Sequence, residues 1–149
     1  NACGITDGAG ALIVTTNERA KELGLAPLAR IKSWAWAGCD PERMGLGPVY
    51  ATARALDQAG VSLSDVGAIE LNEAFAVQVL YCRDQLGIPD EKLNVNGSSI
   101  AIGHPYGMTG ARLVGHALME AKRQGERYAI VTMCVGGGQG MAMIIERLK

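Results

Sequence analysis

The closing segment of the chain, residues 130–145, constrains the fold most, because two apolar runs flank a cysteine and a run of glycines. A dinucleotide-binding loop of the form GxGxxG would need a third glycine where Met141 stands, and a helix after it. The residues that follow the glycines form a short apolar run with β-branched side chains, which is typical of a strand. The segment therefore predicts two strands joined by a glycine-rich turn, with Cys134 at the end of the first strand.

Upstream of this segment, short apolar runs alternate with patterns typical of helices. Further strands are expected over residues 11–16, 28–37 and 67–71. Helices are expected over residues 17–23, 48–59, 74–86 and 109–123, the last with a buried stripe of Ala111, Val114, Leu118 and Ala121. Strands that alternate with helices and end in two consecutive strands predict an α/β domain in which a mixed sheet lies between helices.

The chain has 149 residues, of which 48% are hydrophobic and 19% charged, with a formal net charge of −1. Its length predicts a single domain over residues 1–149, and its charge gives no reason to expect a nucleic acid or an anionic membrane as partner. No apolar run is long enough to span a bilayer. A chain that opens at Asn1 without an initiator methionine is expected to be the later part of something longer.

The cysteines at positions 3, 39, 82 and 134 contain no CxxC pair. A metal site is therefore not expected, and no secretory feature supports a disulfide framework. We expect reduced thiols in an intracellular, cytoplasmic protein.

Three polar loops fall at junctions of strands and helices, where layered α/β folds place their chemistry. In the first loop, residues 71–76, Asn72 and Glu73 meet the start of a helix. Glu73 is interpreted as a stabiliser of the first helical turn, through the helix dipole. Asn72 is interpreted either as a helix cap or as a side chain that holds a water or a substrate oxygen.

The second loop, residues 94–112, carries four glycines, a proline and His104. His104 lies between Gly103 and Pro105, in the rigid and crowded backbone that a general base or an oxyanion donor needs. His116 lies inside the helix that follows, without special neighbours, and is expected to be structural.

The third loop, residues 134–140, joins a thiol to glycine amides. Amides without side chains at the end of a strand can point together at a developing negative oxygen, as the amides of residues 136–138 would do here. Cys134 beside them is expected to act as a nucleophile or proton carrier, whereas Cys82 falls on the buried face of a helix. A histidine, a thiol, an asparagine and oxyanion-forming amides together indicate acyl transfer through tetrahedral or enolate intermediates.

Three segments of these loops resemble the signature blocks of the thiolase family, in that family's order and spacing. They are NEAFA at 72–76, GHPYGMTGAR at 103–112 and CVGGGQG at 134–140. The whole chain is similar to the family's C-terminal half, beginning with NACGITDGA at 1–9, which relatives write NASGxNDGA. The resemblance implies a thiolase-like layered half with a mixed sheet between helices.

Thiolases cleave or form the carbon–carbon bond of 3-ketoacyl-CoA with a nucleophilic cysteine in the N-terminal half, which would precede Asn1 and is absent from this chain. The resemblance implies that His104 activates that thiol and donates to the thioester oxygen, while Asn72 holds a water at the same oxyanion site. It also implies that Cys134 moves the α-proton of the acetyl unit and that the amide of Gly136 belongs to a second oxyanion hole.

The resemblance also implies residues that bind the substrate. Met44 and Phe75 match positions that line the acyl and pantetheine tunnel, and Cys3 stands where relatives carry a serine that touches the pantetheine arm. Ser98 and Ser99 replace the usual glycine and alanine, so a difference in the local backbone path is expected.

The resemblance implies coenzyme A thioesters as substrates, with no cofactor and no metal, and a role in fatty acid metabolism. The expected partners are an N-terminal thiolase half and, in the full-length enzyme, further copies in a homodimer or homotetramer. A degradative 3-ketoacyl-CoA thiolase is the leading interpretation. The alternatives are an acetoacetyl-CoA-specific biosynthetic thiolase and a non-catalytic half-domain that binds acyl-CoA or a partner. Ketoacyl synthases share the fold, but they would place a second histidine where Asn72 stands.

Overall fold

A computed structural model describes residues 1–148 of the chain, which are built around one four-stranded mixed sheet. The strands are β1 (Ala29–Gly38), β2 (Val66–Leu71), β3 (Tyr128–Gly136) and β4 (Gln139–Arg147), and they lie in the order β1-β4-β3-β2. β4 pairs antiparallel with both β1 and β3, whereas β2 pairs parallel with β3. The predicted α/β class with a mixed sheet is confirmed.

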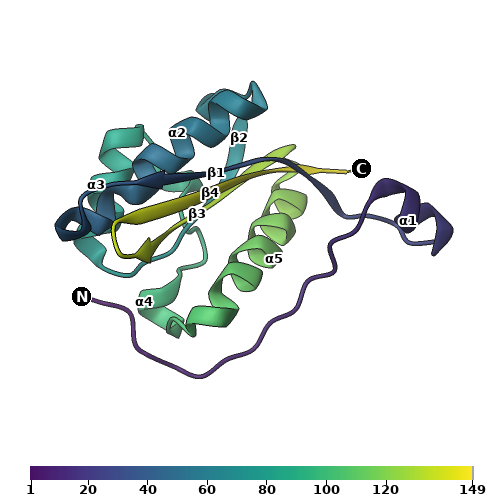
Figure 1. Cartoon of the computed structure of the whole chain (residues 1–149). Coiled ribbons are helices and arrows are strands. Elements are labelled where there is room, and N and C mark those ends of the chain that lie inside the picture. The colour runs from purple at the N-terminus through teal and green to yellow at the C-terminus, as the bar shows by residue number, and fades with distance from the viewer. Residues whose placement is uncertain (149) are drawn as a thin grey trace.

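Helices cover both faces of this sheet (Figure 1). On one face α2 (Gly47–Ala59) packs against β1 and β4 in an apolar core that includes Ala35, Ala51 and Ile144. On the other face α5 (Tyr106–Gln124) packs against β2 and β3. The remaining helices are α1 (Asn17–Glu22), α3 (Ala76–Leu86) and α4 (Ser99–Ile102), with 3₁₀ turns at Pro41–Leu46, Leu63–Asp65 and Asp90–Lys92.

The predicted closing hairpin is confirmed, since β3 and β4 are joined by a tight turn. Gly136, Gly137 and Gly138 all have positive φ angles, of 82°, 60° and 81°. A Cβ atom on Gly138 would lie 2.3 Å from the carbonyl oxygen of Cys39, so a side chain cannot replace the hydrogen there. Gly138 in turn accepts a hydrogen bond of 2.7 Å from the amide of Cys39, which fixes the turn against the end of β1.

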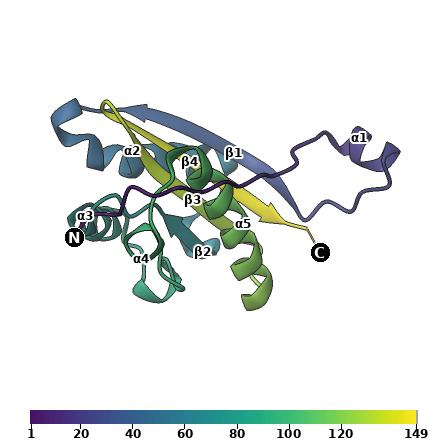
Figure 2. The same ribbon diagram turned by 90° about the horizontal axis from the view of Figure 1, so that it is seen from below.

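The strand predicted over residues 11–16 is wrong. The segment is irregular, and the side chains of Ile13 and Val14 are 87% and 73% exposed. The apolar run alone predicted a buried strand, but none of the four strands described here pairs with it. Seen from below, the N-terminal segment runs instead across α5 (Figure 2). The short helix that follows is confirmed, although Thr16 rather than Asn17 caps it.

The buried stripe predicted for the last helix is confirmed at Ala121, but in the middle of the helix the buried positions lie one residue before the predicted ones. Leu113, Ala117 and Ala121 are completely or almost completely buried in α5, whereas Val114 and Leu118 are only partly buried. The prediction took the buried face of the helix from its apolar residues alone. The inward face of α5 also carries Thr109 and Glu120, both buried and hydrogen-bonded, and these polar positions rotate the helix relative to the purely apolar stripe.

Several large apolar side chains are exposed, with Trp34 and Trp36 of β1 at 59% and 69%. Their strand neighbours Ser33, Ala35 and Ala37 point toward α2 and are buried, as the alternation of a strand requires. The outer face of β1 is therefore an apolar surface that nothing in residues 1–148 covers. In the same part of the chain, no helix combines the length and the apolarity that crossing a membrane would need.

Candidate active site

Asn72 follows the last residue of β2 and is fully buried. Its backbone amide donates to the carbonyl of Thr132 at 3.0 Å, so it continues the pairing of β2 with β3 beyond the strand. The N-cap of α3 is Phe75, three residues later. The interpretation of Asn72 as a helix cap is therefore wrong, and its side chain is free to face the loop that carries His104.

His104 lies in the short loop between α4 and α5. The loop depends on Gly103, whose φ is +94° and whose Cβ, if present, would lie 2.2 Å from the Oγ1 of Thr6. The backbone amide of His104 donates to the carbonyl of Gly4 at 2.9 Å. The N-terminal segment thus holds the histidine loop from outside.

The structure brings His104 and Asn72 together, with the Nε2 of His104 3.4 Å from the Nδ2 of Asn72. On its other side, the Nδ1 of His104 lies 2.6 Å from the Oγ1 of Thr109. The Thr109 hydroxyl donates its single proton to the carbonyl of Pro105 at 3.0 Å, so it accepts from His104. The proton of the neutral imidazole therefore sits on Nδ1, and Nε2 presents a lone pair.

Burial lowers the pKa of His104, and the positive charge of Arg112 lowers it further. The imidazole is consequently neutral at physiological pH. A neutral imidazole with its lone pair on Nε2 is the form that accepts a proton as a general base.

Cys134 lies near the end of β3 and is buried. Its Sγ donates to the Oε1 of Gln78 at 3.7 Å, and within the described residues it makes no hydrogen bond to His104. Burial raises the pKa of Cys134, so the group is a neutral thiol at neutral pH and a source of a proton. Cys82 is fully buried in α3 with its pKa raised to about 12, which fits the apolar role expected for it.

The residues predicted to bind the substrate lie around the same strand ends. The amide of Cys3 donates to the carbonyl of Ala74 at 3.1 Å, and Phe75, 42% exposed, pairs with Ala2. Met44 lies in the 3₁₀ turn Pro41–Leu46 and is partly buried. Gly136 ends β3, two residues after Cys134, with the positive φ that favours glycine.

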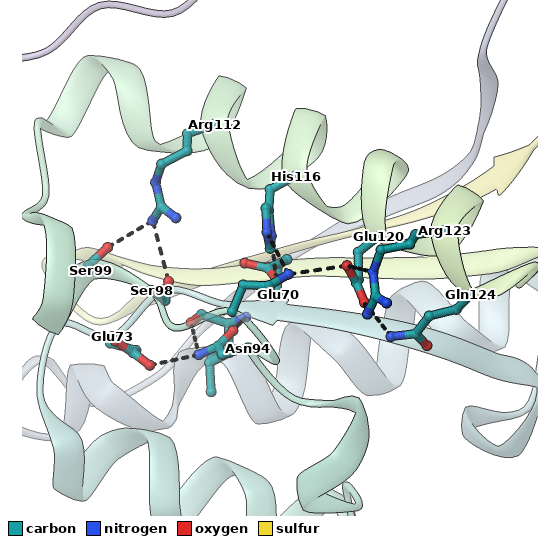
Figure 3. A network of polar contacts seen from close by, with 12 residues as sticks. Glu70, Glu73, Asn94, Ser98, Ser99, Arg112, His116, Glu120, Arg123 and Gln124 are labelled. Atoms are coloured by element: carbon teal, nitrogen blue, oxygen red, sulfur yellow. Dashed lines mark hydrogen bonds and ion pairs between the residues drawn. The ribbon is translucent and has the colours of Figure 1, made fainter.

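Glu73 does not stabilise the first turn of α3, so that prediction is wrong. Its Oε2 accepts the backbone amide of Ile100 at 3.0 Å, at the start of α4, and its Oε1 accepts from Asn94 at 3.1 Å. Figure 3 shows Glu73 pointing at Asn94. Asn94 also pairs with both backbone groups of Leu71, at 2.9 Å each. Together these contacts join the Asn72 loop to the His104 loop.

Sequence reasoning missed Ser99, Arg112, Thr109 and Gln78. Ser99, Thr109 and Gln78 hydrogen-bond to Asn72, His104 and Cys134, respectively, whereas Arg112 hydrogen-bonds to Ser99. The positions of Ser99 and Arg112 in the second loop were visible, but nothing in a linear pattern says which side chain a serine hydroxyl meets.

His116 faces Glu70 of β2, with its Nδ1 2.8 Å from the Oε1 of Glu70 (Figure 3). Glu70 is almost completely buried, and that burial raises the pKa of its carboxyl although His116 partly offsets the effect. The Nε2 of His116 lies 3.2 Å from Asn96, which also donates to Glu120 at 3.1 Å. A structural role, as predicted for His116, fits this network behind the site.

We expect His116→Ala to lower the free energy of unfolding by about 1–3 kcal/mol, because it leaves a buried carboxyl without its hydrogen-bond partner. Burial raises the folded-state pKa of Glu70, so the penalty is small below the ordinary carboxyl pKa and grows as the pH rises through the folded value. Urea unfolding between about pH 5 and about pH 7.5 measures this.

The double variant Glu70→Gln/His116→Ala is the matched control, since it lacks the titrating carboxyl. As the pH rises, the free energy of unfolding of the single variant should fall relative to that of the double variant. Met119→Ala, at an exposed position of the same helix, should cost little. If the difference in the free energy of unfolding between the single and double variants did not change with pH, the assignment of Glu70 as the titrating partner of His116 would be contradicted.

Comparison with known proteins agrees with the fold. Residues 25–147 match the model of the family described as "Thiolase, C-terminal domain". The chain therefore belongs to the thiolase family, as its C-terminal domain. This also confirms the resemblance drawn from the three sequence blocks.

Individual relatives are similar over the whole chain. It is 53% identical to the 3-oxoadipyl-CoA/3-oxo-5,6-dehydrosuberyl-CoA thiolase of Escherichia coli K12, over 99% of this chain and 37% of that protein. It is 51% identical to the acetyl-CoA acetyltransferase of the same organism, over 100% of this chain and 38% of that protein. The crystal structure of the Bacillus anthracis acetyl-CoA acetyltransferase superposes with a TM-score of 0.96 at 47% identity, over 99% of this chain and 38% of that chain. The chain thus spans a little over a third of the length of these relatives.

Proposed function

We propose that this chain is the C-terminal catalytic part of an enzyme that cleaves or forms the carbon–carbon bond of 3-ketoacyl-CoA. The observation that carries the proposal is the pair Asn72–His104, in which a neutral imidazole presents its Nε2 lone pair beside a fixed carboxamide. The thiol of Cys134 lies at the end of the neighbouring strand. A base and a proton donor beside adjacent strand ends suit a reaction that needs both.

In the proposed cleavage, the Nε2 of His104 takes the proton of a nucleophilic thiol supplied by the N-terminal half. The thiolate attacks the 3-keto carbon, the bond between carbons 2 and 3 breaks, and its electron pair remains on the acetyl-CoA unit as an enolate. Protonated His104 and a water held by Asn72 would donate to the oxygen of the acylated thiol.

Cys134 would give its proton to carbon 2 of the enolate, which releases acetyl-CoA. Its raised pKa supports this role, because the thiol arrives protonated. An incoming CoA thiol would then release its proton to solvent and attack the acyl-enzyme as a thiolate, while the Cys134 thiolate recovers a proton from solvent. The leaving nucleophile recovers its proton from His104, so the cycle closes. The amide of Gly136 would serve the enolate oxygen.

The substrate would enter past the N-terminal segment and the 3₁₀ turn Pro41–Leu46. Cys3 and Phe75 lie where the N-terminal segment pairs with the loop after Asn72, and Met44 lies in the 3₁₀ turn. We propose that these three side chains line the path of the pantetheine arm and the acyl chain. This chemistry needs coenzyme A thioesters as substrates and neither a metal nor a further cofactor.

The proposed partner is an N-terminal thiolase half that carries the nucleophile. The exposed apolar face of β1, with Trp34 and Trp36, supports a missing partner, because exposed aromatic side chains gathered on one strand mark an interface. In the full-length enzyme we propose a homodimer or homotetramer, working in the cytoplasm on intermediates of fatty acid metabolism.

We propose the degradative direction, in which 3-ketoacyl-CoA is cleaved. The relative named for 3-oxoadipyl-CoA supports a substrate longer than acetoacetyl-CoA. The second candidate is an acetoacetyl-CoA-specific biosynthetic thiolase, which the relatives named acetyl-CoA acetyltransferase favour. A non-catalytic half-domain would not need the hydrogen bonds from Asn72 and to Thr109 that leave His104 with a lone pair on Nε2.

We expect the full-length protein to cleave 3-ketoacyl-CoA thioesters when free CoA is added, with a higher kcat/KM for six-carbon than for four-carbon substrates. Loss of the absorbance of the magnesium–enolate complex of the substrate measures the rate. A preference for acetoacetyl-CoA would select the second candidate instead. Binding of acyl-CoA without any turnover would contradict the catalytic proposal.

A further inference from the structure

Ser99, the first residue of α4, contacts the catalytic pair from behind. Its Oγ lies 2.5 Å from the Oδ1 of Asn72, and both residues are completely buried. The hydroxyl therefore meets the side of the Asn72 carboxamide opposite to His104. Asn72 has a second neighbour of fixed position as a result.

Arg112 fixes the direction of this hydrogen bond. Its NH2 group donates to the Oγ of Ser99 at 2.9 Å, and also reaches the Oγ of Ser98 at 3.3 Å (Figure 3). A guanidinium only donates, so Ser99 accepts from Arg112 and must send its own single proton elsewhere. The atom within reach is the Oδ1 of Asn72, which accepts it.

The hydrogen bond from Ser99 then fixes the orientation of the Asn72 carboxamide. With its oxygen held by Ser99, the carboxamide presents Nδ2 to the Nε2 of His104, and an amide nitrogen only donates. The Nε2 of His104 must therefore carry the lone pair. The contact with Thr109 on the far side requires the same tautomer independently, because Thr109 accepts from Nδ1.

We propose that Ser99 is a positioning residue: because it accepts from Arg112, it donates to the Oδ1 of Asn72, and Asn72 in turn donates from Nδ2 to His104. This order of hydrogen bonds holds the imidazole in the tautomer that accepts a proton at Nε2. The inference rests on the proposed function, since a base is needed only if a thiol is activated. Ser99 touches no reacting atom. Its effect is to prevent rotation of the Asn72 carboxamide, which would otherwise offer Oδ1 to a protonated Nε2.

The groups around His104 make a rotation of Asn72 measurable as a change in its titration. Thr109 and Asn72 are neutral, Tyr106 contacts the imidazole edge-on at 4.9 Å between ring centroids, and Arg112 is the charge that acts on it. Glu70 and Glu73 act on Arg112. If Oδ1 turned toward His104, it would accept a hydrogen bond from a protonated Nε2 and so stabilise the imidazolium. The pKa of His104 would then rise, and the imidazole would stay protonated up to a higher pH.

The test is the pH dependence of acetyl transfer from acetyl-CoA to the nucleophile of the full-length enzyme, with three variants. Ser99→Ala removes the hydroxyl, and Ser99→Cys keeps a side chain of similar size with a much weaker donor. Ser98→Ala is the matched control, since Ser98 is equally buried and bonds Arg112 but not Asn72. Thermal melts confirm that each variant folds.

In both Ser99 variants we expect the midpoint of the acid limb of the pH–rate profile to lie about one pH unit higher than in the wild type. Acetyl transfer should therefore be roughly tenfold slower at pH values below the midpoint, and near the wild-type rate at alkaline pH. Ser98→Ala should keep the wild-type midpoint. Either folded Ser99 variant suffices to decide. An unmoved midpoint, as expected if Arg112 bonds Oδ1 directly, or an equal shift in Ser98→Ala, would overturn the proposal. An inactive wild-type enzyme would instead contradict the proposed function.

Discussion

Replacing Cys134 with serine in the full-length enzyme should slow turnover by about 10²–10⁴-fold while leaving acylation of the nucleophile nearly intact. General acid–base catalysis by a positioned side chain contributes a factor of this size. Serine keeps the shape of the side chain, but its hydroxyl is a far weaker acid than a thiol. The proton that should reach carbon 2 of the enolate then has no adequate donor. His104, which is proposed to activate the nucleophile, is unchanged.

Two half-reactions measured in the same preparation separate these roles. A burst of acyl-enzyme from acetyl-CoA, followed by stalled condensation, is the expected result for Cys134→Ser. The matched control is Cys82→Ser, a buried cysteine whose Sγ donates only to the carbonyl of Gly45 at 3.4 Å. It should affect stability more than chemistry. Equal loss of both half-reactions in Cys134→Ser would show that the roles are assigned wrongly.

Asn72→Ala and His104→Ala should have non-additive effects on the chemical step, because their side chains contact each other and are proposed to act on one oxyanion. Losing Asn72 should cost about 10- to 1000-fold in turnover, the scale of one oxyanion donor. Losing His104 should cost more, since activation of the nucleophile also ends. The double variant should then resemble the His104 single variant.

A double-mutant cycle in thiolysis, with folding confirmed by thermal melts, measures this coupling. Thr52→Val serves as a control for buried polar substitutions, since Thr52 is fully buried in α2, on the far face of the sheet from α5. Strictly multiplicative losses in the Asn72–His104 cycle would mean that the two side chains act independently, against the geometry of the site.

Much of the fold followed from local pattern. The glycine run between two apolar segments predicted the β3–β4 hairpin, and Gly60 and Gly87 ended α2 and α3 in the left-handed conformation that glycine favours. The strand predicted at 11–16 failed because strand formation needs a pairing partner, which an apolar run cannot reveal by itself. The stripe of α5 shifted because buried polar residues were not counted.

For the site, the sequence placed His104, Asn72 and Cys134 in three separate loops. It could not show that Asn72 and His104 touch, because the contact spans 32 residues and the loop that carries His104 is held against the end of β2 by the hydrogen bonds of Asn94 to Leu71. Glu73 was assigned to the wrong helix for the same reason, since its partner Ile100 lies 27 residues away. Side-chain contacts between distant loops follow from topology and not from local spacing.

The central claim is that His104 and Cys134 wait for a nucleophile that another part of the protein supplies. CoA-dependent cleavage of acetoacetyl-CoA, measured with the purified 149-residue chain alone and with the chain co-expressed with a thiolase N-terminal half, tests it most directly. We expect no protein-dependent cleavage by the chain alone, and activity from the two halves together that disappears when the chain carries His104→Ala. Measurable cleavage by the pure chain alone would contradict the account.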